Sequence, residues 1–220
     1  MTIVISAMPG GDIITANPQY FSNGDEAAAR MPDISTGDLE AVGGMVFINR
    51  TTAEIIAGNL LGANSYVEVT PLPVFEAAIQ SGKTAAAKIP VNGTSLGVNN
   101  PSDILLLKVI SSNNGEFLRY AAAEADYDDG KFTLLAKGSE TPYTGNINPG
   151  AEYDLMIFIR DGGRFDLDKA VNGAVIDPTA IVRRVQQPGN GGDGGSGGCN
   201  AGWGFLAFIG TVPLILGKKK

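Results

Sequence analysis

The sequence predicts a mainly β fold, an immunoglobulin-like β-sandwich with one short helix, followed by a C-terminal transmembrane or sorting helix. From Tyr66 onward, short segments rich in β-branched and aromatic residues alternate with turn residues. About seven short strands within roughly 100 residues are typical of an immunoglobulin-like sandwich. A glycine-rich stretch then separates these strands from an uncharged apolar run near the C-terminus. These observations predict a β-sandwich module and a separate C-terminal segment.

The first part of the chain, residues 1–37, is expected to be irregular, as a linker or the end of a fragment. Residues 24–31 could supply a helical turn or two before Pro32 stops it. Met1 to Gly11 has neither lysine nor arginine, and its apolar stretch is shorter than a signal-peptide core. We therefore expect either a longer parent protein or a start further upstream.

The β-sandwich module is expected to cover residues 38–187. Val46 to Ile48 is β-prone, and the sequence from Thr51 to Glu54 resembles a capping box that opens a helix through Leu61, with Gly62 as its stop. The run from Ile104 to Leu107 is continuously apolar, as in a central strand buried on both faces. The predicted strands are Tyr66–Val69, Val74–Ile79, Thr84–Ile89, Ile104–Ile110, Phe117–Ala122, Lys131–Ala136 and Tyr153–Ile159.

Two connections between these strands carry the Asp-Gly pattern of tight hairpins. Asp128-Asp129-Gly130 precedes Lys131, and Asp161-Gly162-Gly163 follows Arg160. Glycine enters positive φ without steric cost, so both are predicted hairpin turns. Asn92-Gly93 and Asn113-Asn114-Gly115 are predicted to be two further turns.

The C-terminal part has the layout of a membrane-sorting signal. Residues 188–198 form a glycine-rich linker, and residues 199–220 begin with the single cysteine, Cys199, and end in Lys218, Lys219 and Lys220. The uncharged run between them would cover about 25 Å as a helix, a little under the hydrocarbon core of a bilayer. Trp203 suits the headgroup layer, and the three lysines act as a cytoplasmic membrane stop. This orientation places residues 1–198 outside the cell.

The residues around the cysteine resemble a known sorting signal. Ser196, Gly197, Gly198, Cys199, Asn200, Ala201 and Gly202, followed by an apolar helix and a basic end, resemble the Synerg-CTERM sorting domain of surface proteins from Synergistetes-type bacteria. The resemblance implies export, C-terminal processing or anchoring around the cysteine, and an envelope location. The stretch from Asp38 to Asp177 also resembles a module that often precedes this signal and has no assigned activity. From position alone, Cys199 could equally be an unmodified thiol.

The composition excludes several kinds of chemistry. The chain of 220 residues has no histidine, which excludes Ser-His-Asp and Cys-His catalysis and histidine-ligated zinc or iron within it. Its formal net charge is −7, which argues against a nucleic-acid partner. We therefore expect no catalytic residue, no resident metal and no cofactor.

Two acidic groups are candidate sites. Asp126, Asp128 and Asp129 form a weak calcium candidate, but the loop lacks the alternating ligands of an EF-hand and is better explained as a turn. Asp166 and Asp168 would share one face of an extended segment, which allows a carboxylate pair. A solvated surface, or Asp168 capping a short helix over 169–171, explains them better.

Together these features predict a non-enzymatic surface protein of the cell envelope, structural or adhesive in role. Its expected partners are the membrane, through the C-terminal helix, and the C-terminal processing machinery, with a surface ligand unidentified. The alternative is the terminal accessory module of a larger secreted hydrolase whose catalytic part lies upstream. A third possibility is an adhesion module stabilised by calcium.

Overall fold

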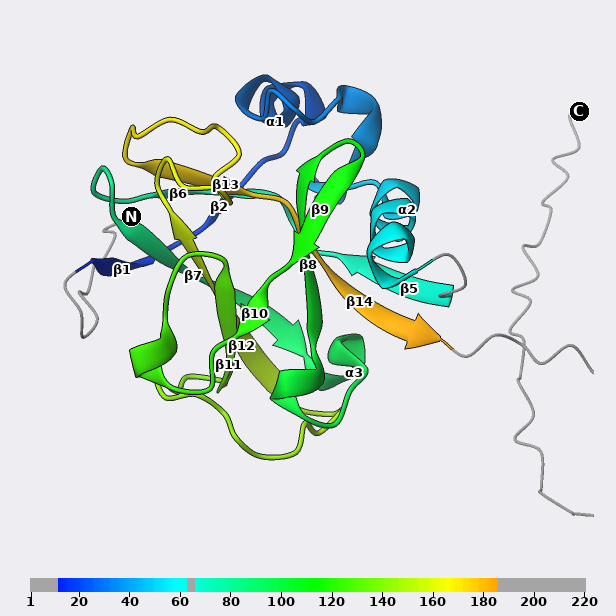
Figure 1. Cartoon of the computed structure of the whole chain (residues 1–220), viewed down its shortest axis with the longest axis vertical. Coiled ribbons are helices and arrows are strands. Elements are labelled where there is room, and N and C mark those ends of the chain that lie inside the picture. Colours follow the sequence, from blue (N-terminus) through cyan, green and yellow to red (C-terminus); the bar gives the residue numbers. More distant parts are fainter. Residues whose placement is uncertain (1–11, 63–65, 186–220) are drawn as a thin grey trace, which may run out of the picture. The chain divides into compact units, whose positions relative to one another are not determined.

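Strands dominate the computed structural model, which describes residues 12–62 and 66–185 (Figure 1). The mainly β character predicted from the sequence is confirmed in these residues. The strands form a five-stranded sheet, a four-stranded sheet, a three-stranded sheet and a two-stranded hairpin. Most contacts between strands lie within the five-stranded and the four-stranded sheets.

The five-stranded sheet has the order β1-β7-β12-β11-β10. Its centre is the long antiparallel pair of β7 (Thr84–Asn92) and β12 (Glu152–Arg160). β11 (Lys131–Ala136) continues the sheet antiparallel to β12, whereas β1 (Ile13–Ala16) is parallel to β7 and β10 (Arg119–Tyr120) is parallel to β11. The N-terminal strand β1 is thus part of the same fold as the later strands.

The four-stranded sheet has the order β5-β14-β8-β9, and all its pairs are antiparallel. Helix α2 (Arg50–Leu61) contacts β5, β8 and β9 of this sheet. Its strands are β5 (Tyr66–Pro71), β8 (Leu105–Ser111), β9 (Asn114–Phe117) and β14 (Thr179–Val185).

Two smaller sheets and two short helices complete the described residues. β6 (Phe75–Ala78) lies between β13 (Ala174–Asp177) and β2 (Gln19–Tyr20), while β3 (Leu39–Val42) pairs with β4 (Met45–Ile48). Helix α1 (Gly24–Arg30) is capped by Asn23, and α3 (Gly93–Leu96) by Asn92. Single helical turns lie at Thr36–Asp38, Pro101–Asp103 and Glu124–Asp126.

Strand β8 separates two apolar clusters. Leu106 packs into the cluster that includes Ile89, Phe132 and Leu155 from the five-stranded sheet. Leu107 and Val109, on the opposite face, join the cluster that includes Ala53, Ile56 and Ala57 of α2. Because side chains alternate along a strand, Lys108 shares the face of Leu106, and it therefore points into the core between the sheets.

Most predicted strands are confirmed, with shifted ends, but the predicted Phe117–Ala122 strand is replaced by β9 and β10. The predicted helix is α2, whose N-cap is Asn49 rather than Thr51. Gly62 ends it with φ 102°, as expected. Residues 13–30, expected to be irregular apart from a helical turn or two, contain β1, β2 and α1.

The immunoglobulin-like arrangement is not confirmed. An immunoglobulin-like sandwich consists of antiparallel sheets, whereas β1 and β10 each lie parallel to a neighbour. The described part of the chain also has three α-helices, where one was predicted.

The two predicted Asp-Gly hairpins were wrong. β10 and β11, on either side of Asp128-Asp129-Gly130, are parallel, because the turn binds β12 instead: Gly130 N–H donates to the Phe158 carbonyl at 3.0 Å. A Cβ at Gly130 would lie 2.1 Å from the Phe165 ring, so glycine is required there. Asp161-Gly162-Gly163 opens a long loop to β13, which lies in a different sheet from β12. Asn113 lies in the predicted β8–β9 turn, whereas Asn92 caps α3.

Candidate functional site

The predicted sorting motif lies outside the described residues. This applies to Ser196 through Gly202, including Cys199, and to the membrane-stop residues Lys218, Lys219 and Lys220. Among the described residues, no helix has the length and apolar character needed to cross a bilayer. The membrane-spanning C-terminal helix therefore remains a prediction from the sequence.

The calcium candidate Asp126, Asp128 and Asp129 is engaged in backbone contacts. Asp129 Oδ1 accepts the Arg160 N–H at 2.9 Å, and Asp128 Oδ1 accepts the Asp129 N–H at 2.8 Å. The Asp126 carbonyl accepts a hydrogen bond from Lys131 Nζ at 2.6 Å. Within residues 12–62 and 66–185, no group of three or more acidic or cysteine side chains is arranged to hold a metal ion.

The loop between β12 and β13 is organised around Asp161. This side chain is 2 % exposed, and its carboxylate accepts backbone N–H groups from Gly82, Asn172 and Gly173 at 2.7, 3.1 and 3.1 Å. Burial alone would raise the pKa of Asp161, but these hydrogen bonds outweigh it and the pKa lies below its usual value. Asp161 is thus an ionised anchor that ties the loop to the β6–β7 turn.

Asp166 is fully buried in the same loop, and it does not share an extended face with Asp168. Asp166 Oδ2 accepts the Gly162 N–H at 2.9 Å, and Oδ1 accepts the Ile176 N–H at 3.0 Å. Burial raises the pKa of Asp166 to about 6 in spite of these bonds. The short helix expected after Asp168 is absent from this described loop: Lys169 has φ 57°, and Asp168 Oδ1 accepts the Ala170 N–H.

The most unusual pair of side chains is Lys108 on β8 and Asp177 at the end of β13. Both side chains are 0 % exposed, and Lys108 Nζ lies 2.5 Å from Asp177 Oδ1. Lys108 Nζ also donates to the Ile176 carbonyl at 3.2 Å. Asp177 Oδ2 is buried and has no hydrogen-bond partner in the described part of the chain.

The surroundings of this pair destabilise both of its charges. Burial lowers the pKa of Lys108 below its usual value, although the Asp177 carboxylate opposes the shift. Burial raises the pKa of Asp177, with Lys108 again opposing. Desolvation therefore weakens the preference for the ion pair over a neutral amine beside a neutral carboxylic acid.

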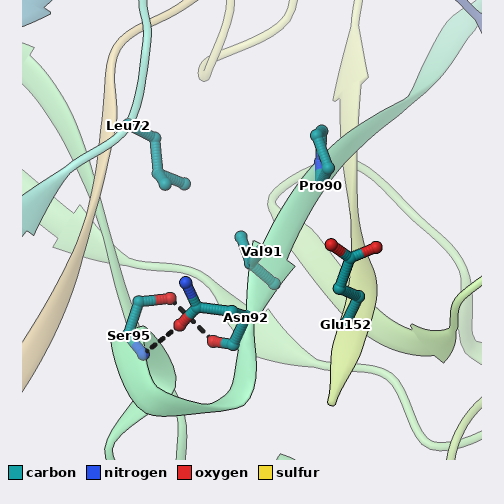
Figure 2. Close-up of a pocket in the computed structure, with 6 residues that line it drawn as sticks. All are labelled: Leu72, Pro90, Val91, Asn92, Ser95 and Glu152. Carbon is teal, nitrogen blue, oxygen red and sulfur yellow. Dashed lines mark hydrogen bonds between the residues drawn. The ribbon is translucent and has the colours of Figure 1, made fainter. Parts of the chain in front are cut away.

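A surface pocket of about 260 Å³ lies at the junction of β7 and α3 (Figure 2). Asn92 and Ser95 are joined by two hydrogen bonds of 2.8 Å, and Glu152 lies opposite Asn92 on β12. Glu152 is the single ionisable residue among its lining residues, which are Leu72, Pro90, Val91, Asn92, Ser95 and Glu152. The pocket therefore presents no pair of carboxylates for acid–base chemistry.

The Lys108–Asp177 pair was missed by reasoning from the sequence. A lysine between Leu107 and Val109, in a strand predicted to be buried on both faces, was the available signal, because a buried lysine requires a partner. The partner could not be found in the same way, since β13 and β14 were not among the predicted strands.

Comparisons of this chain with models of protein families, with curated proteins and with solved structures found no match.

Proposed function

We propose that this chain is a non-enzymatic surface protein of the bacterial cell envelope, with a structural or adhesive β-rich module delivered by a C-terminal sorting signal. The observation that carries the proposal is the order of the C-terminal residues: small residues, Cys199, an uncharged apolar run and three lysines. That order matches export, anchoring by a short span and a cytoplasmic stop.

The fold supports the proposal in one respect. The last described strand, β14, ends at Val185, and Gln186 and Gln187 separate it from the glycine-rich residues 188–198. A folded module followed by a segment of glycine-rich composition suits display at a distance from a membrane. The proposal requires a β-rich module only, and not the immunoglobulin-like order from which the two parallel pairs depart.

The placement of the charged groups supports a structural role. Lys108 and Asp177, the ionisable pair with the strongest desolvation, are sealed in the core at 0 % exposure, where no substrate can reach them. The surface pocket of Figure 2 offers one carboxylate, Glu152, beside an Asn92–Ser95 cap. These features suit a load-bearing or binding module.

A reporter fusion tests the proposal. A secretory signal peptide, a fluorescent protein that folds after export and residues 188–220 are joined in that order, and the fusion is expressed in the bacterium that encodes this chain. We expect the fusion in the envelope fraction, and replacing Lys218, Lys219 and Lys220 with glutamate should release it or abolish its accumulation. If the cysteine is processed, the Cys199→Ser fusion should be recovered at the mass of its own unprocessed sequence. A wild-type fusion that is exported and recovered as a freely soluble protein would refute the proposal.

A further inference from the structure

We propose that Lys108 and Asp177 condense into an intramolecular amide bond that covalently joins β8 to β13. The two reacting groups are already in contact, with Nζ 2.5 Å from Oδ1 and both side chains fully buried. β8 belongs to the four-stranded sheet and β13 to the three-stranded sheet, so the bond would connect two sheets. The inference concerns the chemistry of the core and does not depend on the proposed location of the protein.

The protonation states suit an attack by the amine. An ammonium has no lone pair, and a carboxylate resists nucleophiles, so an exposed Lys–Asp pair at neutral pH does not react. Here burial lowers the pKa of Lys108 and raises that of Asp177, which favours the free amine and the neutral acid in the same contact. Enclosure also holds the two groups together, which replaces an encounter in solution with a step inside one molecule.

The step balances without any oxidant or co-reactant. The lone pair of Nζ attacks Cγ of Asp177 and forms the C–N bond. The tetrahedral carbon then expels one carboxyl oxygen as hydroxide, which leaves as water after it takes a proton that Nζ gives up. One N–H bond and one C–O bond break, and the product is a secondary amide with loss of one water.

The product fits the hydrogen bonds of the site better than the separate groups do. Condensation removes one of the two carboxyl oxygens of Asp177, and Oδ2 is buried without a hydrogen-bond partner among the described residues. The amide retains one N–H on Nζ, which can still donate to the Ile176 carbonyl, now 3.2 Å away. Two buried ionisable groups are thereby replaced by one neutral group.

Asp166 positions the strand that carries Asp177. It is fully buried in the loop before β13, and its two oxygens accept the backbone N–H groups of Gly162 and Ile176. Ile176 directly precedes Asp177, and its carbonyl accepts a hydrogen bond from Lys108 Nζ. Asp166 is therefore a positioning residue, which holds the acid in place for attack by the amine.

Intact-mass measurement of the folded full-length chain tests the bond. We expect a mass lower than the sequence mass by one water, in addition to any processing of the C-terminal segment. Trypsin should yield one branched peptide joining residues 89–119 to residues 170–183, because the acylated Lys108 is no longer cleaved. Separate peptides 89–108 and 170–183 after prolonged incubation of the folded protein would overturn the proposal.

Four variants test the bond further. Lys108→Arg keeps a basic side chain but cannot form this amide, so it should show the full sequence mass. Lys137→Arg, at the exposed pair with Asp154, should lose one water as the wild type does. Asp166→Asn should slow the loss of water at least tenfold, followed by mass after refolding. Asp161→Asn disturbs the same loop without this role, so equal slowing in both loop variants would remove Asp166 from the mechanism.

Discussion

Two lysine–aspartate pairs in this molecule have similar contacts and opposite environments. Lys108 Nζ lies 2.5 Å from Asp177 Oδ1 with both side chains at 0 % exposure. Lys137 Nζ lies 2.9 Å from Asp154 Oδ1, and these side chains are 49 % and 14 % exposed. Burial lowers the pKa of Lys108, whereas the hydrogen bond with Asp154 raises that of Lys137. The same two residue types therefore have their charges destabilised in the core and stabilised at the surface.

Exposure to solvent, more than the distance between the partners, therefore determines how stable the charges of such a pair are. In water, hydration supports both charges, so the exposed pair is an ordinary surface ion pair. In the core, the desolvation of two charges competes with their attraction. The buried pair is therefore the one whose stability, titration and reactivity should respond strongly to mutation.

Of the variants proposed, Lys108→Ala should lower the free energy of unfolding most. The substitution leaves Asp177 buried without its partner and opens a cavity in the core, so we expect a loss of about 3–5 kcal/mol in the free energy of unfolding. Denaturation in urea, followed by circular dichroism, measures this loss. The double variant Lys108→Met with Asp177→Leu should recover the part of the loss that comes from the unpaired carboxyl, because an apolar pair of similar volume buries no ionisable group. A single variant as stable as wild type would show that the core tolerates an unpaired Asp177.

The second effect concerns Asp161, a buried carboxylate supported by backbone N–H groups instead of a lysine. Asp161→Ala leaves the N–H groups of Gly82, Asn172 and Gly173 without their acceptor, and we expect a loss of about 2–4 kcal/mol. Limited proteolysis should also cut the 161–173 loop faster. Asp128→Ala is the matched control, because Asp128 is exposed and its carboxylate accepts the N–H of the neighbouring Asp129. Equal losses in the two variants would contradict the role of Asp161 as an anchor.

The sequence predicted a turn at Asp161 but gave no prediction for the side chain of Lys108. Asp161 was assigned to a tight hairpin from its Asp-Gly pattern, and it does begin a turn, but its partners are far away in the sequence. The helix over Arg50–Leu61 and the β8–β9 turn were predictable because local spacing and turn chemistry specify them. Lys108 and Asp177 are separated by 69 positions in the sequence. Their contact and the strand order both depend on long-range pairing, which the periodicity of a single sequence does not encode.

Asp166 should make the free energy of unfolding depend on pH. Its pKa in the folded protein is about 6, against an ordinary value of 3.8, so the folded state holds this proton more tightly than the unfolded state. The resulting stabilisation is fully present below about pH 4 and is lost as the pH rises through about 6. The shift corresponds to about 3 kcal/mol at most.

Urea denaturation at several pH values between 4 and 8 measures this contribution. Burial also raises the pKa values of Asp177 and Asp129, so these residues contribute to the pH dependence as well. Asp166→Asn cannot titrate at this position. The difference between wild type and this variant in the slope of the unfolding free energy against pH therefore gives the contribution of Asp166 alone. We expect wild type to lose more stability than the variant across this range. Parallel pH profiles would mean that Asp166 is ionised throughout.

Lys137→Ala, at the exposed pair, should change the stability of the protein least. Asp154 Oδ2 also accepts the Gly138 N–H at 3.4 Å, so the carboxylate keeps a donor, and water replaces the lysine. We expect a melting midpoint within the scatter of replicate melts, and a further rise in salt should leave it unchanged. A large drop for Lys137→Ala, comparable with that for Lys108→Ala, would mean that contact with aspartate matters regardless of solvent. The contrast between the two pairs would then lose its physical basis, since the exposed lysine would depend on its partner as the buried one does.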